Sequence, residues 1–180
     1  MHKEIIVSEV AMKPEIRVLE EADAADFWKL RLRGLKEDPE AFGASFADSV
    51  NSTQEEICKR LANTSETFAL GAFNPNPCGM LGFYRRQGER VRHKGSIWGV
   101  YVAPEARGVG LARRLMVEAI ERAKQMPGLE EVILTVSTTQ EAAMKLYQSL
   151  GFNEYGHEVN ALKQGDIYID EKMMMLRLHD

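Results

Sequence analysis

The apolar and polar positions in the first half of the chain predict a strand, two helices and a hairpin. Ile16 and Val18 are apolar at a spacing of two, which is the period of a strand with one buried face. A capping box formed by Thr53 and Glu56 marks the start of the second helix. The predicted elements are a strand at 14–19, helices at 22–36 and 53–63, and strands at 67–73 and 80–86 around a turn at 74–79.

The second half of the chain has the stronger pattern. Leu111, Leu115 and Ala119 recur every four residues, which predicts an amphipathic helix. Residues 132–136 are apolar almost throughout, as in a central strand that is covered on both faces. The predicted elements are a strand at 96–102, a helix at 110–125, a strand at 132–136, a helix at 140–150, and strands near 154–157 and 168–178.

This order of elements predicts an α/β (α+β) fold. A mixed central sheet of about six to seven strands, flanked by about four helices, accommodates it. No internal repeat or low-complexity linker divides the 180 residues, a length that suits one domain. We therefore expect a single domain over residues 1–180.

Composition narrows the classes of function. Lys and Arg number 23 and Asp and Glu 27, a net charge of −4 that argues against a nucleic-acid module. No apolar run approaches the ~20 residues that span a bilayer, and Glu4 and Glu9 interrupt the Met1–Val10 segment, so no signal peptide is predicted. We expect a cytoplasmic protein with neither nucleic acid nor membrane as a partner. Cys58 and Cys78 have no metal-site spacing; free thiols are expected, although two cysteines can also pair.

The segment Val100–Ala112 carries the most chemical information. It consists of a strand, a short turn and a loop with Gly108 and Gly110 that opens directly into the strongest helix. Free backbone N–H groups and the helix dipole at such a point form an anion site that suits phosphate. The loop lacks the Gly-Lys-Ser/Thr ending of a P-loop, and Arg113 stands where a dinucleotide-binding loop needs a small residue. The spacing alone also allows a glycine-rich connector that binds nothing.

Two motifs in this half of the chain resemble the GNAT acetyltransferases. Arg107-Gly-Val-Gly-Leu-Ala112 matches their Arg/Gln-x-x-Gly-x-Gly/Ala signature, and residues 143–152 are similar to their closing helix and the strand after it. The resemblance implies the GNAT acyl-CoA N-acyltransferase fold. It also implies transfer of an acetyl group from acetyl-CoA, without a metal, to a primary amine of a small molecule, a protein N-terminus or a lysine. A homodimer is compatible with it.

The resemblance assigns roles to single residues. Tyr147 would be the general acid that protonates the departing thiolate, whereas the pattern alone equally allows a core tyrosine. The helix-start N–H groups would hold the CoA pyrophosphate and the preceding strand the pantetheine arm, while Gln140 stands where many members carry asparagine. The residues so assigned to acetyl-CoA are Val100, Tyr101, Val102, Arg107, Gly108, Val109, Gly110, Leu111, Ala112, Arg113 and Gln140.

The acceptor side of the site is less defined. Neither central strand carries a carboxylate, and Thr135 stands where the branch that acetylates ribosomal protein N-termini often has glutamate. The segments that contain Glu158 and Asp170 are similar to a subgroup of small GNAT proteins, so we predict that Glu158 or Asp170 binds the acceptor ammonium or passes its proton to water. His157 and Glu171 are further candidates for the base, and solvated loop charge is the alternative for the whole group. Phe42 and Phe46 are core or cavity-wall residues.

Two other functions stay open. One is a CoA-binding regulatory module that does not catalyse. The other is a nucleotide-binding protein that uses the same loop, although Leu111 and Ala112 offer it no magnesium ligand.

Overall fold

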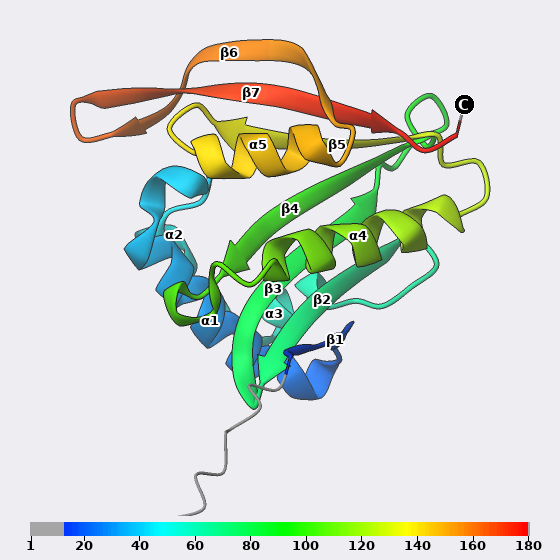
Figure 1. Cartoon of the computed structure of the whole chain (residues 1–180). Coiled ribbons are helices and arrows are strands. Elements are labelled where there is room, and N and C mark those ends of the chain that lie inside the picture. Colours follow the sequence, from blue (N-terminus) through cyan, green and yellow to red (C-terminus); the bar gives the residue numbers. More distant parts are fainter. Residues whose placement is uncertain (1–12, 180) are drawn as a thin grey trace, which may run out of the picture.

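The computed structural model describes residues 13–179, which form one seven-stranded sheet with helices on both faces (Figure 1). The strand order is β1-β2-β3-β4-β5-β7-β6, and all neighbours are antiparallel except β4 and β5. The expectation about Met1–Val10 lies outside the described residues. The strands are β1 Glu15–Val18, β2 Thr67–Asn74, β3 Asn76–Arg85, β4 Lys94–Val102, β5 Glu131–Ser137, β6 Asn153–Gln164 and β7 Ile167–Arg177.

Helices α1 and α4 cover opposite faces of the sheet (Figure 1). A Cβ at Gly79 of β3 would meet Leu111 and Leu115 of α4, whereas a Cβ at Gly34 of α1 would meet the ring of Tyr101 on β4. The helices are α1 Ala24–Glu37, α2 Phe46–Ser49, α3 Gln54–Arg60, α4 Leu111–Lys124 and α5 Glu141–Ser149, with 3-10 turns at Glu21–Asp23, Pro39–Ala41 and Pro104–Ala106.

The predicted fold class is confirmed, and local differences have physical reasons. The turn predicted at 74–79 is shorter, because β3 starts at Asn76 and a bulge at Ala72/Phe73 absorbs the offset in register. The single turn of α2 was not predicted, since it depends on Ser45, whose hydroxyl accepts from the Asp48 amide at 3.0 Å. Strand β6 is longer than predicted because its largely exposed residues show no alternation of burial. Both cysteines are free thiols, as predicted.

Strands β4 and β5 separate along their length, which creates the main feature of the fold. They pair only through Lys94–Ser96 and Glu131–Ile133, and Figure 1 shows them close at that end and apart at the other. On its opposite edge β4 has a bulge: Gly99, at φ 63°, and Val100 together face Leu81 of β3. A bulge bends its strand and increases its twist, which directs β4 away from β5.

Candidate active site

The gap between β4 and β5 holds a cavity of about 370 Å³, which we call the gap cavity. Beyond Ser96 the edge of β4 that faces β5 has no strand partner, so its backbone N–H and C=O groups border the cavity. An extended ligand that enters here can pair with β4 as another strand does. The sequence-predicted residues that line the gap cavity are Val100, Tyr101, Val102, Arg107, Ala112, Gln140 and Tyr147.

The loop before α4 lies at the Arg107 and Ala112 end of the gap cavity. Gly108 and Gly110 have φ angles of 81° and 75°, and a Cβ at either position would meet nothing within 4 Å. The first amide bonded within α4 is that of Arg114, which donates to the Gly110 carbonyl at 3.1 Å. Between 13 and 179 no backbone acceptor exists for the six preceding amides, from 108 to 113. Six free donors at a helix N-terminus, with open space above them, form an anion site.

Ion pairs to the end of α1 hold this loop in place. Arg107 donates to the Asp38 carboxylate at 2.6 Å and to the Val102 carbonyl at 2.9 Å. Arg33 of α1 binds Glu105, in the turn before the loop, through two bonds of 2.6 and 2.9 Å. The Arg107 guanidinium is therefore occupied by protein partners, and it positions the loop while it borders the cavity.

Tyr147 of α5 lines the gap cavity with only 6% of its surface exposed. Burial raises the pKa of its phenol to about 12, because the charged phenolate is poorly solvated there, and no hydrogen bond to a described residue contributes to that shift. Tyr147 is thus a protonated donor at neutral pH. Its ring lies 6.1 Å from that of Phe152, which anchors the start of β6 against α5.

A second cavity, of about 450 Å³, opens on the α1 side of the same gap. We call it the α1-side cavity. Phe42 lines it, whereas Phe46 does not and packs half-buried against the core. It meets the gap cavity between β4 and β5, where residues line both cavities; these are Ala41, Ile97, Trp98, Gly99, Leu134 and Thr135.

Comparison with known proteins decides the family. A sequence model of the acetyltransferase (GNAT) family matches residues 32–152, which is more than half of the chain. The chain belongs to the GNAT acetyltransferase family. The family predicted from the two sequence motifs is thereby confirmed.

Solved structures share this GNAT fold. The acetyltransferase of GNAT family from Streptococcus pneumoniae is 28% identical, with a TM-score of 0.83 over 92% of this chain and 99% of that chain. The structure of yncA from Salmonella typhimurium with its cofactor acetyl-CoA is 21% identical, with a TM-score of 0.78 over 94% of this chain and 96% of that chain.

Two curated relatives match only part of their own length. A mycothiol acetyltransferase from Paenarthrobacter aurescens is 42% identical over 65 residues, which is 36% of this chain and 20% of that protein. The spermidine N(1)-acetyltransferase of Vibrio cholerae is 31% identical over 84 residues, 47% of this chain and 49% of that protein. The matched stretches thus span about a fifth and about half of these relatives.

The acidic residues singled out in the sequence lie in different places in this GNAT fold, and one of them, Glu171, lines a cavity. Asp170 accepts from the Asn160 amide at 2.8 Å and from His157 Nε2 at 2.9 Å, contacts that lower its pKa, and Asn160 lies where the register of β6 shifts. Glu158 is exposed, and neither it nor Asp170 lines the two cavities. Glu171 lines the α1-side cavity, and desolvation together with the charge of Glu158 raises its pKa.

Sequence reasoning named Glu171 as a further candidate for the base and did not point to Arg31, which also lines the α1-side cavity. The spacing of apolar residues in the sequence contained a signal for each of these two residues. Glu171 lies two residues from Met173 on one face of β7, and both line the cavity. Arg31 lies four residues from Phe27 and four from Leu35, and therefore on the buried stripe of α1.

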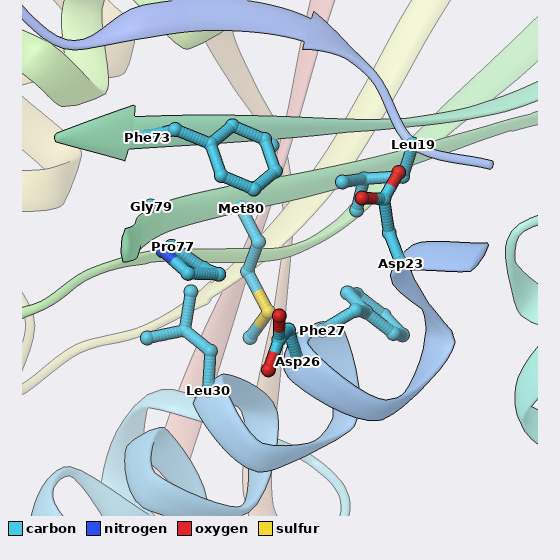
Figure 2. Close-up of a pocket in the computed structure, with 10 residues that line it drawn as sticks. Leu19, Asp23, Asp26, Phe27, Leu30, Phe73, Pro77, Gly79 and Met80 are labelled. Carbon is cyan, nitrogen blue, oxygen red and sulfur yellow. The ribbon is translucent and has the colours of Figure 1, made fainter. Parts of the chain in front are cut away.

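A third cavity, of only about 10 Å³, lies between α1 and the β2–β3 hairpin (Figure 2). Figure 2 shows Met80 extending from β3 towards α1, where Phe27 and Leu30 also border the space. This volume is at the lower limit for a single water. It is a packing gap and no substrate site.

Neither a metal centre nor a membrane helix is found among residues 13–179. Their His, Cys, Asp and Glu side chains form no group of three or more that could hold a metal ion. None of the helices in that range is both long and apolar enough to cross a membrane.

Proposed function

We propose that this GNAT protein transfers the acetyl group of acetyl-CoA to a primary amine in the gap between β4 and β5. The observation that carries the proposal is the arrangement of the gap cavity. Free helix-start amides lie at one end, an unpaired strand edge runs along one side, and a buried, protonated Tyr147 borders it. Each of these features suits one part of an acyl-CoA.

The residues present fit acetyl-CoA. The six free amides from 108 to 113 suit the pyrophosphate, and the open space at Gly108 and Gly110 allows it to approach the backbone. The free edge of β4 from Val100 to Val102 suits the pantetheine amides. When bound there, acetyl-CoA supplies the acetyl group as a thioester. Arg113 donates to Ser149 Oγ at 2.8 Å, so its side chain ties α4 to α5, and its backbone amide is the group that would hold the phosphates.

Tyr147 would donate its proton to the sulfur as the carbon–sulfur bond breaks. Its raised pKa keeps the proton on the phenol until the thiolate develops. A backbone N–H on the free edge of β4 would stabilise the charge that develops on the carbonyl oxygen. Neither Cys58 nor Cys78 lines either cavity, which supports direct attack by the amine over an acetyl-cysteine intermediate.

The acceptor amine would reach the gap from the α1-side cavity, which meets the gap cavity at Trp98 and Thr135. Glu171 is the acidic residue placed to hold its ammonium or accept its proton, because a carboxylate with a raised pKa is the stronger base. A cavity of about 450 Å³ has the size of a small-molecule site, which favours a small-molecule acceptor over a protein N-terminus or lysine. Two relatives are named for the small molecules mycothiol and spermidine, which agrees with this choice.

The test combines calorimetry with turnover. Acetyl-CoA should bind the isolated protein, and a panel of small amines should yield one free CoA thiol for each acetylated product identified by mass spectrometry. Acetyl-CoA binding without transfer to any amine of the panel would make the protein a CoA-binding module. Absence of acetyl-CoA binding would refute the whole assignment.

A further inference from the structure

Arg31 is a buried cation that has no anionic partner among residues 13–179. The residue is only 5% exposed, and its buried Nε and Nη1 atoms make no hydrogen bond to any residue that the structure describes. Among the ion pairs of residues 13–179, none includes Arg31. Buried charges in proteins are ordinarily paired, because an uncompensated charge of low solvent access is strongly destabilising.

Aromatic rings surround the Arg31 guanidinium in place of a carboxylate. Its Cζ lies 5.2 Å from the ring centre of Trp98 and 5.8 Å from those of Trp28 and Phe42. Ring faces attract a cation, but more weakly than a carboxylate does. Burial and the positive charge of Arg60 lower the pKa of Arg31 to about 10, which still leaves it protonated at neutral pH.

Arg31 lines the α1-side cavity, so its uncompensated positive charge borders that space. Arg86 also lines it, donates to Ser96 Oγ at 3.4 Å, and forms no ion pair within the described part of the chain. Glu171 is the acidic residue on the cavity wall. The cavity therefore presents two guanidinium groups and one carboxylate to whatever enters it. A ligand that matches this set carries both an anionic group and a cationic group.

We infer that the acceptor is an amino acid or a close analogue, whose carboxylate binds Arg31 and whose amine points to the gap between β4 and β5. This inference rests on the proposed function and narrows its substrate class. The carboxylate supplies the anion that Arg31 lacks, with Arg86 as a second cation on the same cavity wall. The ammonium faces Glu171 before it loses its proton and attacks the thioester. A polyamine such as spermidine offers no anion and meets two like charges.

The test compares acceptors that differ in one charge. The twenty L-amino acids are each assayed beside their α-carboxamides, with spermidine as a third class, by acetyl-CoA-dependent thiol release. We expect the best amino acid to exceed its amide in kcat/KM by on the order of 10²-fold, as for loss of one partner from a buried charge pair. A second readout needs no turnover: with CoA bound, the amino acid should raise the melting temperature and its amide should not.

Variants at Arg31 test whether this residue causes the preference for an acceptor with a free carboxylate. Arg31→Met, which keeps an unbranched apolar stem and removes the guanidinium, should abolish both the acid preference and the ligand-induced rise in melting temperature. Its acetyl-CoA affinity and its own stability should hold, since an unpaired charge is removed. Arg31→Lys should retain part of the preference, and Lys29→Met, on the exposed side of the same helix, should retain all of it.

The outcomes separate this inference from the proposed function. Equal kcat/KM for acids and amides, or an acid preference that survives Arg31→Met, would overturn the inference and leave acetyl transfer intact. An Arg31→Met variant that unfolds or loses activity equally with every acceptor would show that Arg31 is structural, and would also overturn it. If no acceptor is acetylated, the proposed acetyl transfer fails. The carboxylate site is still supported if an amino acid raises the melting temperature of the wild type and not that of Arg31→Met.

Discussion

Gly82 of β3 lies directly beneath the indole of Trp98 on β4. A Cβ at Gly82 would stand 2.0 Å from Trp98 Cε2, far inside van der Waals contact. Trp98 lines both cavities, and its ring meets that of Phe27 edge-on at 6.5 Å. The missing side chain of Gly82 therefore fixes the position of the ring where the two cavities meet.

The first prediction follows from this contact. Gly82→Ala should displace Trp98 and lower the free energy of unfolding by about 1–3 kcal/mol, the usual cost of overpacking. It should also raise the acceptor KM more than the Kd for acetyl-CoA. Urea unfolding measures the first effect, with Gly43→Ala as the stability control, because a Cβ there meets only Leu162 at 3.9 Å. Equal stability of the two variants would show that the ring moves aside at no cost.

The second prediction concerns the anion site before α4. Gly110→Asp should weaken acetyl-CoA binding by at least about 10²-fold, because it puts a negative charge and a side chain where the pyrophosphate should lie. Gly165→Asp is the matched control: Gly165, in the β6–β7 turn, also has a positive φ, of 60°, and nothing within 4 Å of its Cβ position. Calorimetry on both folded variants measures the Kd for acetyl-CoA. Similar Kd values for Gly110→Asp and Gly165→Asp would show that this loop does not bind the pyrophosphate.

The third prediction distinguishes the acidic candidates of the acceptor side. Glu171→Gln should raise the acceptor KM about tenfold and leave acetyl-CoA affinity unchanged, since loss of ground-state binding appears in KM. Glu158→Gln and Asp170→Asn test the prediction made from the sequence, that Glu158 or Asp170 binds the acceptor ammonium. If either of them raises KM while Glu171→Gln does not, the ammonium is bound by that residue and not by Glu171.

The fourth prediction is an alkaline loss of stability caused by Tyr147. Its pKa is about 12 in the folded protein against an ordinary value of 10.0, so the contribution of the neutral phenol is complete below about pH 10. It is then lost as pH rises towards 12, because the unfolded chain releases the proton first. Relative to Tyr147→Phe, the wild type should lose roughly 3 kcal/mol over this range. Parallel curves for the two proteins in urea unfolding from pH 8 to 12 would contradict the raised pKa.

The sequence predicted most of the elements, and the glycine loop that opens into α4, because both depend on local pattern. Leu111, Leu115 and Ala119 form the buried stripe of α4, as their spacing indicated, and Gly108 and Gly110 precede the helix. The capping box of α3 also forms, with Thr53 and Glu56 bonded in both directions.

The acceptor side depends on long-range contacts that no local pattern contains. Asp170 lies on β7 but holds His157 and Asn160 of β6, where the register shifts between Glu158 and Leu162. Arg31 of α1 becomes a cavity residue because parts of β4, β5 and β7, all distant in the sequence, line the same cavity. For Arg31, the signal available in the sequence was a charged residue on an apolar helical stripe.

The most direct test of the account is single-turnover transfer by Tyr147→Phe. The change removes only the hydroxyl and keeps the ring against Phe152, so the fold and the acetyl-CoA Kd should persist. With saturating acetyl-CoA and a good acceptor, the transfer rate at neutral pH should fall by about 10²-fold, the usual contribution of a general acid. Tyr168→Phe, on the exposed β6–β7 hairpin, should transfer at the wild-type rate. A Tyr147→Phe variant that also transfers at the wild-type rate would contradict the claim that Tyr147 protonates the departing thiolate in the gap between β4 and β5.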